Sequence, residues 1–198
     1  MPVAQDVIES LNAQLGKELE AHLQYLAISS WFDSEGLPEL TGFFARQAAE
    51  EHDHAMRFLT YIQDVGGPLV IPAHAAPKPA FESAEEAVAA SLDWEKEVTA
   101  SIDAIMDQAV AMRDHATQAF LQWFVSEQVE EVSTMGELLQ VTRRAGEGNL
   151  LLLEDYVARL GGSPGAARRW SRPPPPARSR TTAGTPGWRG PASRSPGP

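Results

Sequence analysis

Four long segments of this sequence carry apolar residues every three or four positions, the period of a helix that buries one face. They span residues 4–32, 38–65, 83–112 and 114–144, and each has an acidic residue in the middle of its apolar row. The row of the first segment is formed by Val7 or Ile8, Leu11, Leu15, Leu19, Leu23, Leu26 and Trp31. Burying an unpaired carboxylate costs on the order of several kcal/mol, comparable with the whole stability of a small domain. Any helical fold of this chain must therefore place positive charge beside these acids.

The polar residues of the four rows sit at similar distances from the ends of their segments. They are Glu18 in the first segment, Glu51 and His54 in the second, Glu95 in the third, and Gln128 and Glu131 in the fourth. In an antiparallel bundle they would meet at one level near the middle. A polar network could hold the helices in register there, as a buried asparagine does in a coiled coil. Four carboxylates around one neutral histidine would repel one another, however, so we favour a bound cation.

The spacing of Glu51 and His54 fits a pair of metal ligands. Glu-x-x-His presents oxygen and nitrogen atoms on one helix face, and the pair recurs on facing helices of di-iron four-helix bundles. Carboxylates with few imidazoles and no thiolate suit iron, manganese or zinc. Glu51 could bridge two ions. The other ligands would be Glu18 and His54 on one side, and Glu95 and Glu131 on the other.

The expected chemistry is oxidation, because a site rich in carboxylates stabilises the more highly charged ion. A pair of Fe(II) ions that meets dioxygen there would be driven towards Fe(III). Tyr25 lies two helical turns after Glu18 on the same face. Its hydroxyl could hydrogen-bond a ligand, and its ring could supply an electron.

The residues between the four rows predict how the helices connect. A short link before Pro38 makes the first two helices antiparallel neighbours. Residues 66–82 contain four prolines and predict an ordered crossover between the second and third helices. Ser83 and Asp114 are expected to cap the third and fourth helices. Residues 150–160 predict a short fifth helix, so apolar that we expect copies from other subunits to cover it. The predicted fold is all-α, a four-helix bundle with a long crossover and a short C-terminal helix.

Composition divides the chain in two. All 27 acidic residues, with only nine basic ones, lie in residues 1–162, and we expect this acidic body to be one domain that attracts cations. Residues 163–198 hold nine prolines, seven arginines and no acid, so we expect a disordered tail. The chain has no cysteine, no signal-peptide pattern and no run of about 18 apolar residues. We therefore expect a cytoplasmic protein with neither a membrane nor nucleic acid as its partner.

The polar motifs together resemble those of the bacterial non-haem ferritins of the ferritin-like superfamily, especially the actinobacterial type. The resemblance covers about residues 5–160. It rests on Glu18 with Tyr25, on Glu-Glu-His-Asp-His at 50–54, on Glu95, and on Gln-Trp-Phe-Val-Ser-Glu-Gln-Val-Glu-Glu at 122–131. It implies a ferroxidase that oxidises Fe(II) with O2 or H2O2 and stores a ferric mineral inside a shell of twenty-four subunits.

The resemblance also implies a role for each matching residue. The first iron site would be Glu18, Glu51 and His54; the second would be Glu51, Glu95 and Glu131, with Gln128 hydrogen-bonded nearby; a third, towards the cavity, would be Glu50, Glu127 and Glu130. Tyr25 matches the tyrosine of this family. Bacterioferritins have a second Glu-x-x-His on the fourth helix and a haem-binding methionine where this chain has His52, so we expect no haem.

Two other functions stay open on the sequence. One is a di-iron or di-manganese oxidase or peroxidase that stores no mineral. The other is a cage or scaffold without catalysis.

Overall fold

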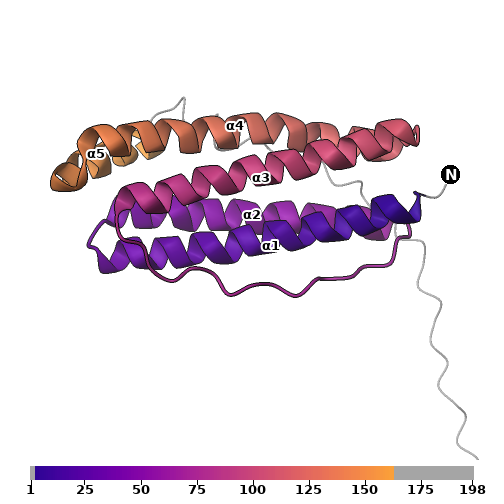
Figure 1. Ribbon diagram of the computed structural model, residues 1–198, viewed down its shortest axis with the longest axis horizontal. Coiled ribbons are helices and arrows are strands. Elements are labelled where there is room, and N and C mark those ends of the chain that lie inside the picture. Colours follow the sequence, from indigo (N-terminus) through magenta and orange to yellow (C-terminus); the bar gives the residue numbers. More distant parts are fainter. Residues whose placement is uncertain (1–2, 163–198) are drawn as a thin grey trace, which may run out of the picture.

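The computed structural model describes residues 3–162, which form a four-helix bundle closed at one end by a fifth helix (Figure 1). The elements are α1 (Gln5–Ser34), α2 (Pro38–Asp64), α3 (Ala84–Ala111), α4 (His115–Ala145), the single 3-10 turn η1 (Glu147–Asn149) and α5 (Leu150–Gly162). The predicted all-α bundle with a long crossover and a short last helix is confirmed. The tail of residues 163–198 and its predicted disorder lie outside the described residues.

Helices α3 and α4 begin at residues whose side chains can cap the first turn, and α2 is followed by a glycine of the kind that ends helices. The side chain of Ser83 accepts the N–H of Glu86 at 3.1 Å, and Asp114 accepts the N–H of Thr117 at 3.1 Å. Each bond pairs one of the amides that the first turn of a helix leaves free. After α2, Gly66 adopts a φ of 74°, a left-handed conformation that suits glycine. Within residues 3–162, no helix is long and apolar enough to cross a membrane.

The apolar core consists of two clusters, one towards each end of the bundle. One cluster gathers around Phe32 and Phe44, and the other around Leu15, Phe58 and Phe124. Four buried glutamates, one on each long helix, and His54 lie between the members of these two clusters along the helices. The predicted layer of polar side chains near the middle therefore exists in the structure.

The predicted apolar row of α1 is wrong at two positions. Leu23 and Leu26 are 38% and 44% exposed in the single chain. From Leu11 to Leu23 the row repeats every four residues, and each step advances by about 400° around the helix, so Leu23 has drifted away from the core. The drift does not explain the exposure of Leu26, which follows Leu23 by three residues. The buried row instead alternates steps of three and four, and it includes Glu18, Tyr25 and Phe32.

A second face of α1 holds the crossover. Four residues spaced four apart share this role: Asn12, Gly16, Glu20 and Gln24. Three of them bond to the backbone of the crossover, with distances of 2.7 Å from Val70 N to Asn12 Oδ1, 3.3 Å from Ala75 N to Glu20 Oε1, and 2.8 Å from Lys78 N to Gln24 Oε1. Gly16 has no side chain where the ring of Pro72 lies. The crossover runs along the bundle as an ordered strap because α1 pairs its polar groups.

The fifth helix is only partly free to meet other subunits. Leu153 and Val157 are buried against the bundle, whereas Leu151 and Leu152 are 80% and 64% exposed. Glu154 is also buried, and its two carboxylate oxygens accept the backbone N–H groups of residues 39 and 40 at 2.8 Å each. The expectation that other copies cover this helix therefore applies to one of its faces, and the bundle itself covers the other.

We predict opposite effects of alanine at two helical glycines. A Cβ at Gly16 would lie 2.3 Å from Pro72 Cγ, whereas a Cβ at Gly136 would meet nothing within 4 Å. Gly16→Ala should therefore lower the free energy of unfolding by about 1–3 kcal/mol, and Gly136→Ala should raise it by about 0.5–1 kcal/mol. Chemical denaturation of the two variants measures both changes. Equal stabilisation by both would contradict the close fit of the crossover on α1.

Candidate metal centre

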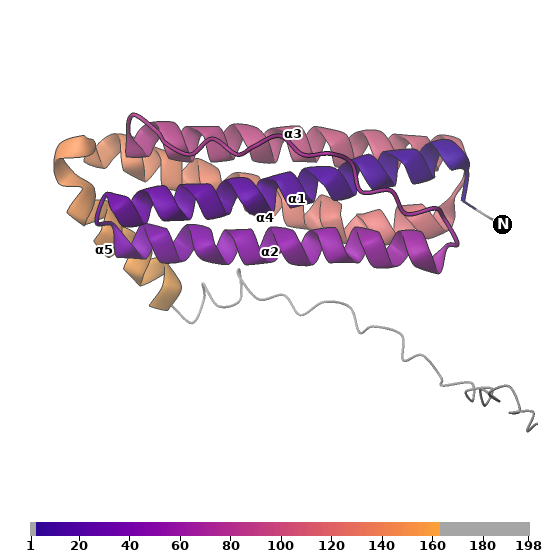
Figure 2. The ribbon, with the colours of Figure 1, turned by 90° about the horizontal axis from the view of Figure 1, so that it is seen from below.

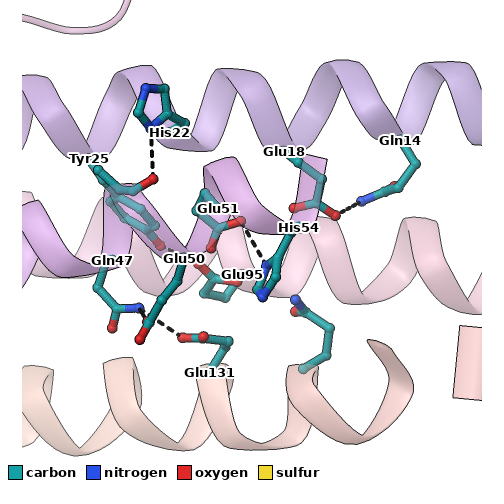
Figure 3. Close-up of polar contacts among 12 residues, drawn as sticks. Gln14, Glu18, His22, Tyr25, Gln47, Glu50, Glu51, His54, Glu95 and Glu131 are labelled. Carbon is teal, nitrogen blue, oxygen red and sulfur yellow. Dashed lines mark hydrogen bonds and ion pairs between the residues drawn. The ribbon is translucent and has the colours of Figure 1, made fainter. Parts of the chain in front are cut away.

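A layer of buried acids and one imidazole crosses the bundle between the two apolar clusters (Figure 3). Each helix of the bundle contributes to it, with Glu18 from α1, Glu51 and His54 from α2, Glu95 from α3, and Gln128 and Glu131 from α4. All six side chains are at most 6% exposed. The structure thus brings together every residue that the sequence assigned to the two inner metal sites.

Three of these residues converge closely enough to hold one cation. Potential ligand atoms of Glu18, Glu51 and His54 all lie within 4.8 Å of one another. His54 Nδ1 lies 3.3 Å from Glu51 Oε2, and Gln14 Nε2 donates to Glu18 Oε1 at 2.8 Å. Among the described residues, this is the one group of three or more such ligands that meets so tightly. It matches the first predicted site.

The residues of the second predicted site are neighbours but are bonded to other partners. The hydroxyl of Tyr25 donates a short hydrogen bond to Glu95 Oε1. Gln47 Nε2 approaches Glu131 Oε2 at 3.4 Å. Thr99 Oγ1 donates to Gln128 Oε1 at 2.9 Å. The side chain of Gln128 in turn hydrogen-bonds Glu95 and thereby opposes the rise in the pKa of that carboxyl. A cation in this half of the layer would compete with Tyr25 for Glu95.

Burial and mutual repulsion make these carboxyl groups weak acids in the metal-free protein. Burial is the largest cause in each case, and it raises the pKa of Glu18, Glu51 and Glu131 well above the ordinary value; neighbouring carboxylates raise these pKa values further. The pKa of Glu95 rises to about 7, although the Tyr25 hydroxyl opposes this shift. Burial and the charge of Glu95 likewise raise the pKa of Tyr25. Positive charge at the centre would favour the ionised carboxylates.

The unpaired oxygens of the layer fit a cation. Glu18 Oε2, Glu51 Oε1 and Glu95 Oε2 are buried and have no hydrogen-bond partner. Leaving a buried polar atom unpaired is costly, and buried carboxylates in proteins are normally paired or bound to metal. Because oxygen and imidazole atoms with no sulfur suit iron, manganese and zinc, the residues present fit such an ion.

Two members of the third predicted group, Glu50 and Glu127, influence each other electrostatically. The charge of Glu127 contributes to the raised pKa of Glu50, which reaches about 7 chiefly through burial. The charge of Glu127 also raises the pKa of Glu51 and of Glu131. Glu50 and Glu127 therefore extend the acidic layer, and a ligand role for Glu130 stays a prediction.

Two buried glutamines that were not expected to have a role belong to the site. Gln14 and Gln47 are both fully buried, and each lies one helical turn before a candidate ligand of its own helix. Gln47 Nε2 donates to Glu50 Oε2 at 2.7 Å as well as approaching Glu131. The signal in the sequence was the glutamine four residues before Glu18 and again before Glu51. An amide at these positions can orient a carboxylate without adding charge.

Two histidines near the layer point elsewhere. His22 Nδ1 lies 2.7 Å from the carbonyl oxygen of Ala48 on α2, and Figure 3 shows this contact apart from the cluster of carboxylates. The ring of His52 lies 5.6 Å from that of His22 at the helix surface. Of the three histidines in this region, only His54 faces the carboxylates.

Comparison with known proteins gives one consistent family. The family model described as Ferritin-like domain matches residues 8–145. The chain is 39% identical to Ferritin BfrB of Mycolicibacterium smegmatis, over 77% of this chain and 84% of the relative. It is 35% identical to a bacterial non-heme ferritin of Staphylococcus aureus, over 80% of this chain and 95% of the relative. The crystal structure of an open pore ferritin from Archaeoglobus fulgidus superposes with a TM-score of 0.76 at 31% identity, covering 79% of this chain and 98% of that chain.

We predict that the metal-free protein loses stability as the pH rises. Folding raises the pKa of the buried carboxyls above the value of 4.5 for a free glutamate, to about 7 for Glu95. The folded protein therefore retains protons that the unfolded chain releases, and the free energy of unfolding should fall between about pH 4.5 and pH 7, by on the order of a few kcal/mol. Denaturation of chelator-treated protein at pH 5 and pH 8 measures this loss.

The control for this prediction is the double variant Glu18→Gln with Glu51→Gln, which has the same shape but two fewer carboxyls. It should show a shallower pH dependence and should exceed the original chain in stability at pH 8 without metal. A pH profile identical to that of the original chain would mean that these acids ionise freely.

Proposed function

Because the chain belongs to the ferritin family, we propose that it oxidises Fe(II) with dioxygen at the buried centre and stores Fe(III) inside a hollow shell of 24 copies. The observation that carries this proposal is the set of unpaired carboxylate oxygens on Glu18, Glu51 and Glu95, next to His54. A structural polar network would have paired these oxygens with donors. Fe(II) is a substrate in this proposal, and H2O2 is an alternative oxidant.

The chain's own residues have distinct tasks in the proposed reaction. Glu18, Glu51 and His54 bind one Fe(II) ion, and Glu51, Glu95 and Glu131 bind the other. Two Fe(II) ions release two electrons, which together with two protons reduce one O2 to H2O2. Burial excludes bulk water, and Gln14 orients Glu18 through its 2.8 Å hydrogen bond. Tyr25 holds Glu95 in metal-free protein and must release or share it when the second ion binds.

The surface of the chain supports assembly into a shell. Leu151 and Leu152 on α5, and Leu23 and Leu26 on α1, are exposed in the single chain. Contiguous exposed apolar side chains, such as those of the adjacent Leu151 and Leu152, are typical of contact surfaces between subunits. Curated relatives named ferritin and the open pore ferritin structure support the same conclusion.

We predict that two neighbouring histidines differ sharply in importance. His54→Ala removes the only imidazole of the centre and should lower the initial rate of Fe(II) oxidation at least 10-fold. His52→Ala is the matched control, because its exposed ring lies one residue after Glu51 and points away from the acids; its rate should stay within about 2-fold of the original. The rate is followed as the absorbance of Fe(III) after anaerobic protein with Fe(II) is mixed with oxygenated buffer. Equal rates in the two variants would remove the proposed role of His54.

A separate prediction distinguishes storage from simple oxidase activity. A catalytic pair without storage saturates at two ions per chain, whereas a storing shell continues to take up iron. Stepwise aerobic loading, followed by gel filtration and iron analysis, should give far more than two iron atoms per chain in a particle of 24 copies. Saturation at two would favour an oxidase or peroxidase that stores no mineral, and no oxidation at all would favour a scaffold.

A further inference from the structure

A groove between α2 and α4 lies outside the metal layer and has no function in the proposed reaction. It encloses about 490 Å3 along the C-terminal half of α2 and the N-terminal half of α4. Its residues are Asp53, Met56, Arg57, Thr60, Tyr61, Asp64, Ala119, Phe120, Trp123 and Phe124. Four of these ten residues are aromatic, and the stretch of α2 that lines the groove begins with Asp53 and ends with Asp64. We call this feature the α2–α4 groove.

The aromatic rings of the groove are ordered into a rigid wall. The rings of Tyr61 and Phe120 stack with centroids 4.0 Å apart and an angle of 4° between their planes. The guanidinium of Arg57 lies 4.0 Å from the centre of the Trp123 ring, and the charges of Asp53 and Glu127 act on it. Arg57 is therefore already engaged, and the groove offers a flat, half-buried aromatic surface to a ligand.

The chain carries a segment with the complementary chemistry. Residues 172–178 read Arg-Pro-Pro-Pro-Pro-Ala-Arg, and no acid occurs after residue 162. Proline runs adopt the polyproline II helix, and aromatic grooves recognise this helix in several domain families because its shape is fixed before binding. An arginine at each end adds the charge that the aspartates at the ends of the groove would attract.

The spacing of the charges agrees between segment and groove. Asp53 and Asp64 are separated by 11 helical residues, or about 16 Å along α2 at roughly 1.5 Å per residue. Arg172 and Arg178 are six residues apart, or about 19 Å at roughly 3.1 Å per residue in a polyproline II helix. Arginine side chains are long and flexible enough to absorb the difference.

The segment also begins close enough to reach the groove. Glu154 fixes α5 at the first turn of α2, and Figure 2 shows the last turns of α5 projecting past α2 on the side away from α1 and α3. From there, Asp53 lies about 20 Å further along α2, and the end of α5 lies about 12 Å from Glu154. The nine residues between Gly162 and Arg172 make ten Cα–Cα steps, which span up to about 33 Å.

We propose that residues 172–178 of the chain dock in the α2–α4 groove of the same subunit, parallel to α2. Arg172 pairs with Asp53, Arg178 pairs with Asp64, and the prolines between them pack on Tyr61, Phe120 and Trp123. Docking neutralises part of the acidic body and covers aromatic surface that would otherwise meet water. The assignment is independent of the chemistry proposed for the metal centre.

Disulfide trapping in the full chain tests this proposal, because the sequence has no natural cysteine. The test protein carries Thr60→Cys, in the groove, and Ala177→Cys, next to Arg178. The matched control carries Thr60→Cys and Ala192→Cys, which lies beyond the docking segment. We expect the test pair to form an intrachain disulfide at least 10-fold faster than the control under mild oxidation, as measured by mass spectrometry and non-reducing gels.

A third variant asks whether the charge at the end of the groove matters. Adding Asp64→Arg to the test protein reverses an exposed charge at the C-terminus of α2, where a positive charge does not weaken the helix. It should reduce the trapping rate to that of the control. Equal rates for test and control pairs would overturn the proposal. A product made mainly of covalent dimers would also overturn it, since the groove would then hold the segment of another copy.

Discussion

The fold places mutually repelling carboxylates side by side, and the protein's own side chains supply too little positive charge to balance them. Four carboxylates from four different helices meet in one buried layer, and three of their oxygens have no hydrogen-bond partner. In the absence of a cation they must hold protons, which is why their pKa values are raised. The two apolar clusters on either side supply the stability that this arrangement costs, and they hold the acids at a fixed height. Binding of cations and folding of the bundle are consequently linked: each favours the geometry that the other requires.

Much of the fold follows from the sequence because its signals are local. Alternating steps of three and four residues identified the buried face of α4, and Ser83 and Asp114 marked helix starts that the structure confirms. Errors arose where the same spacing of residues is compatible with either a buried or an exposed helix face. Leucines every four residues on α1 resembled a core row, but their drift around the helix turned Leu23 outwards. The role of Asn12, Glu20 and Gln24 was not predicted, because their bonding partner is a segment about 55 residues later in the chain.

The candidate metal centre was likewise predictable in part: the sequence identified its ligands but not the hydrogen bonds between them. Acids and an imidazole inside apolar rows were recognisable from the sequence, since charge in a core requires an explanation. The detailed bonding was not, because it depends on which side chains meet across helices. Gln47 reaches Glu50 and Glu131, and Tyr25 reaches Glu95 over a separation of 70 residues. Spacing along one helix contains no information about such pairs. The structure therefore adds the competition between Tyr25 and a second ion for the same carboxylate.

The carboxylate of Glu154 has a consequence for how the molecule opens. It pairs the first two free amides of α2, the helix that also holds Glu51 and His54. Local opening of α5 would leave those amides bare and fray the beginning of α2, so the two elements should exchange their amide hydrogens as one cooperative unit. The fifth helix, at the far end of the bundle, thus protects the part of α2 that leads to the buried acids. Contacts between subunits on the outer face of α5 would therefore change the stability of the start of α2 through Glu154.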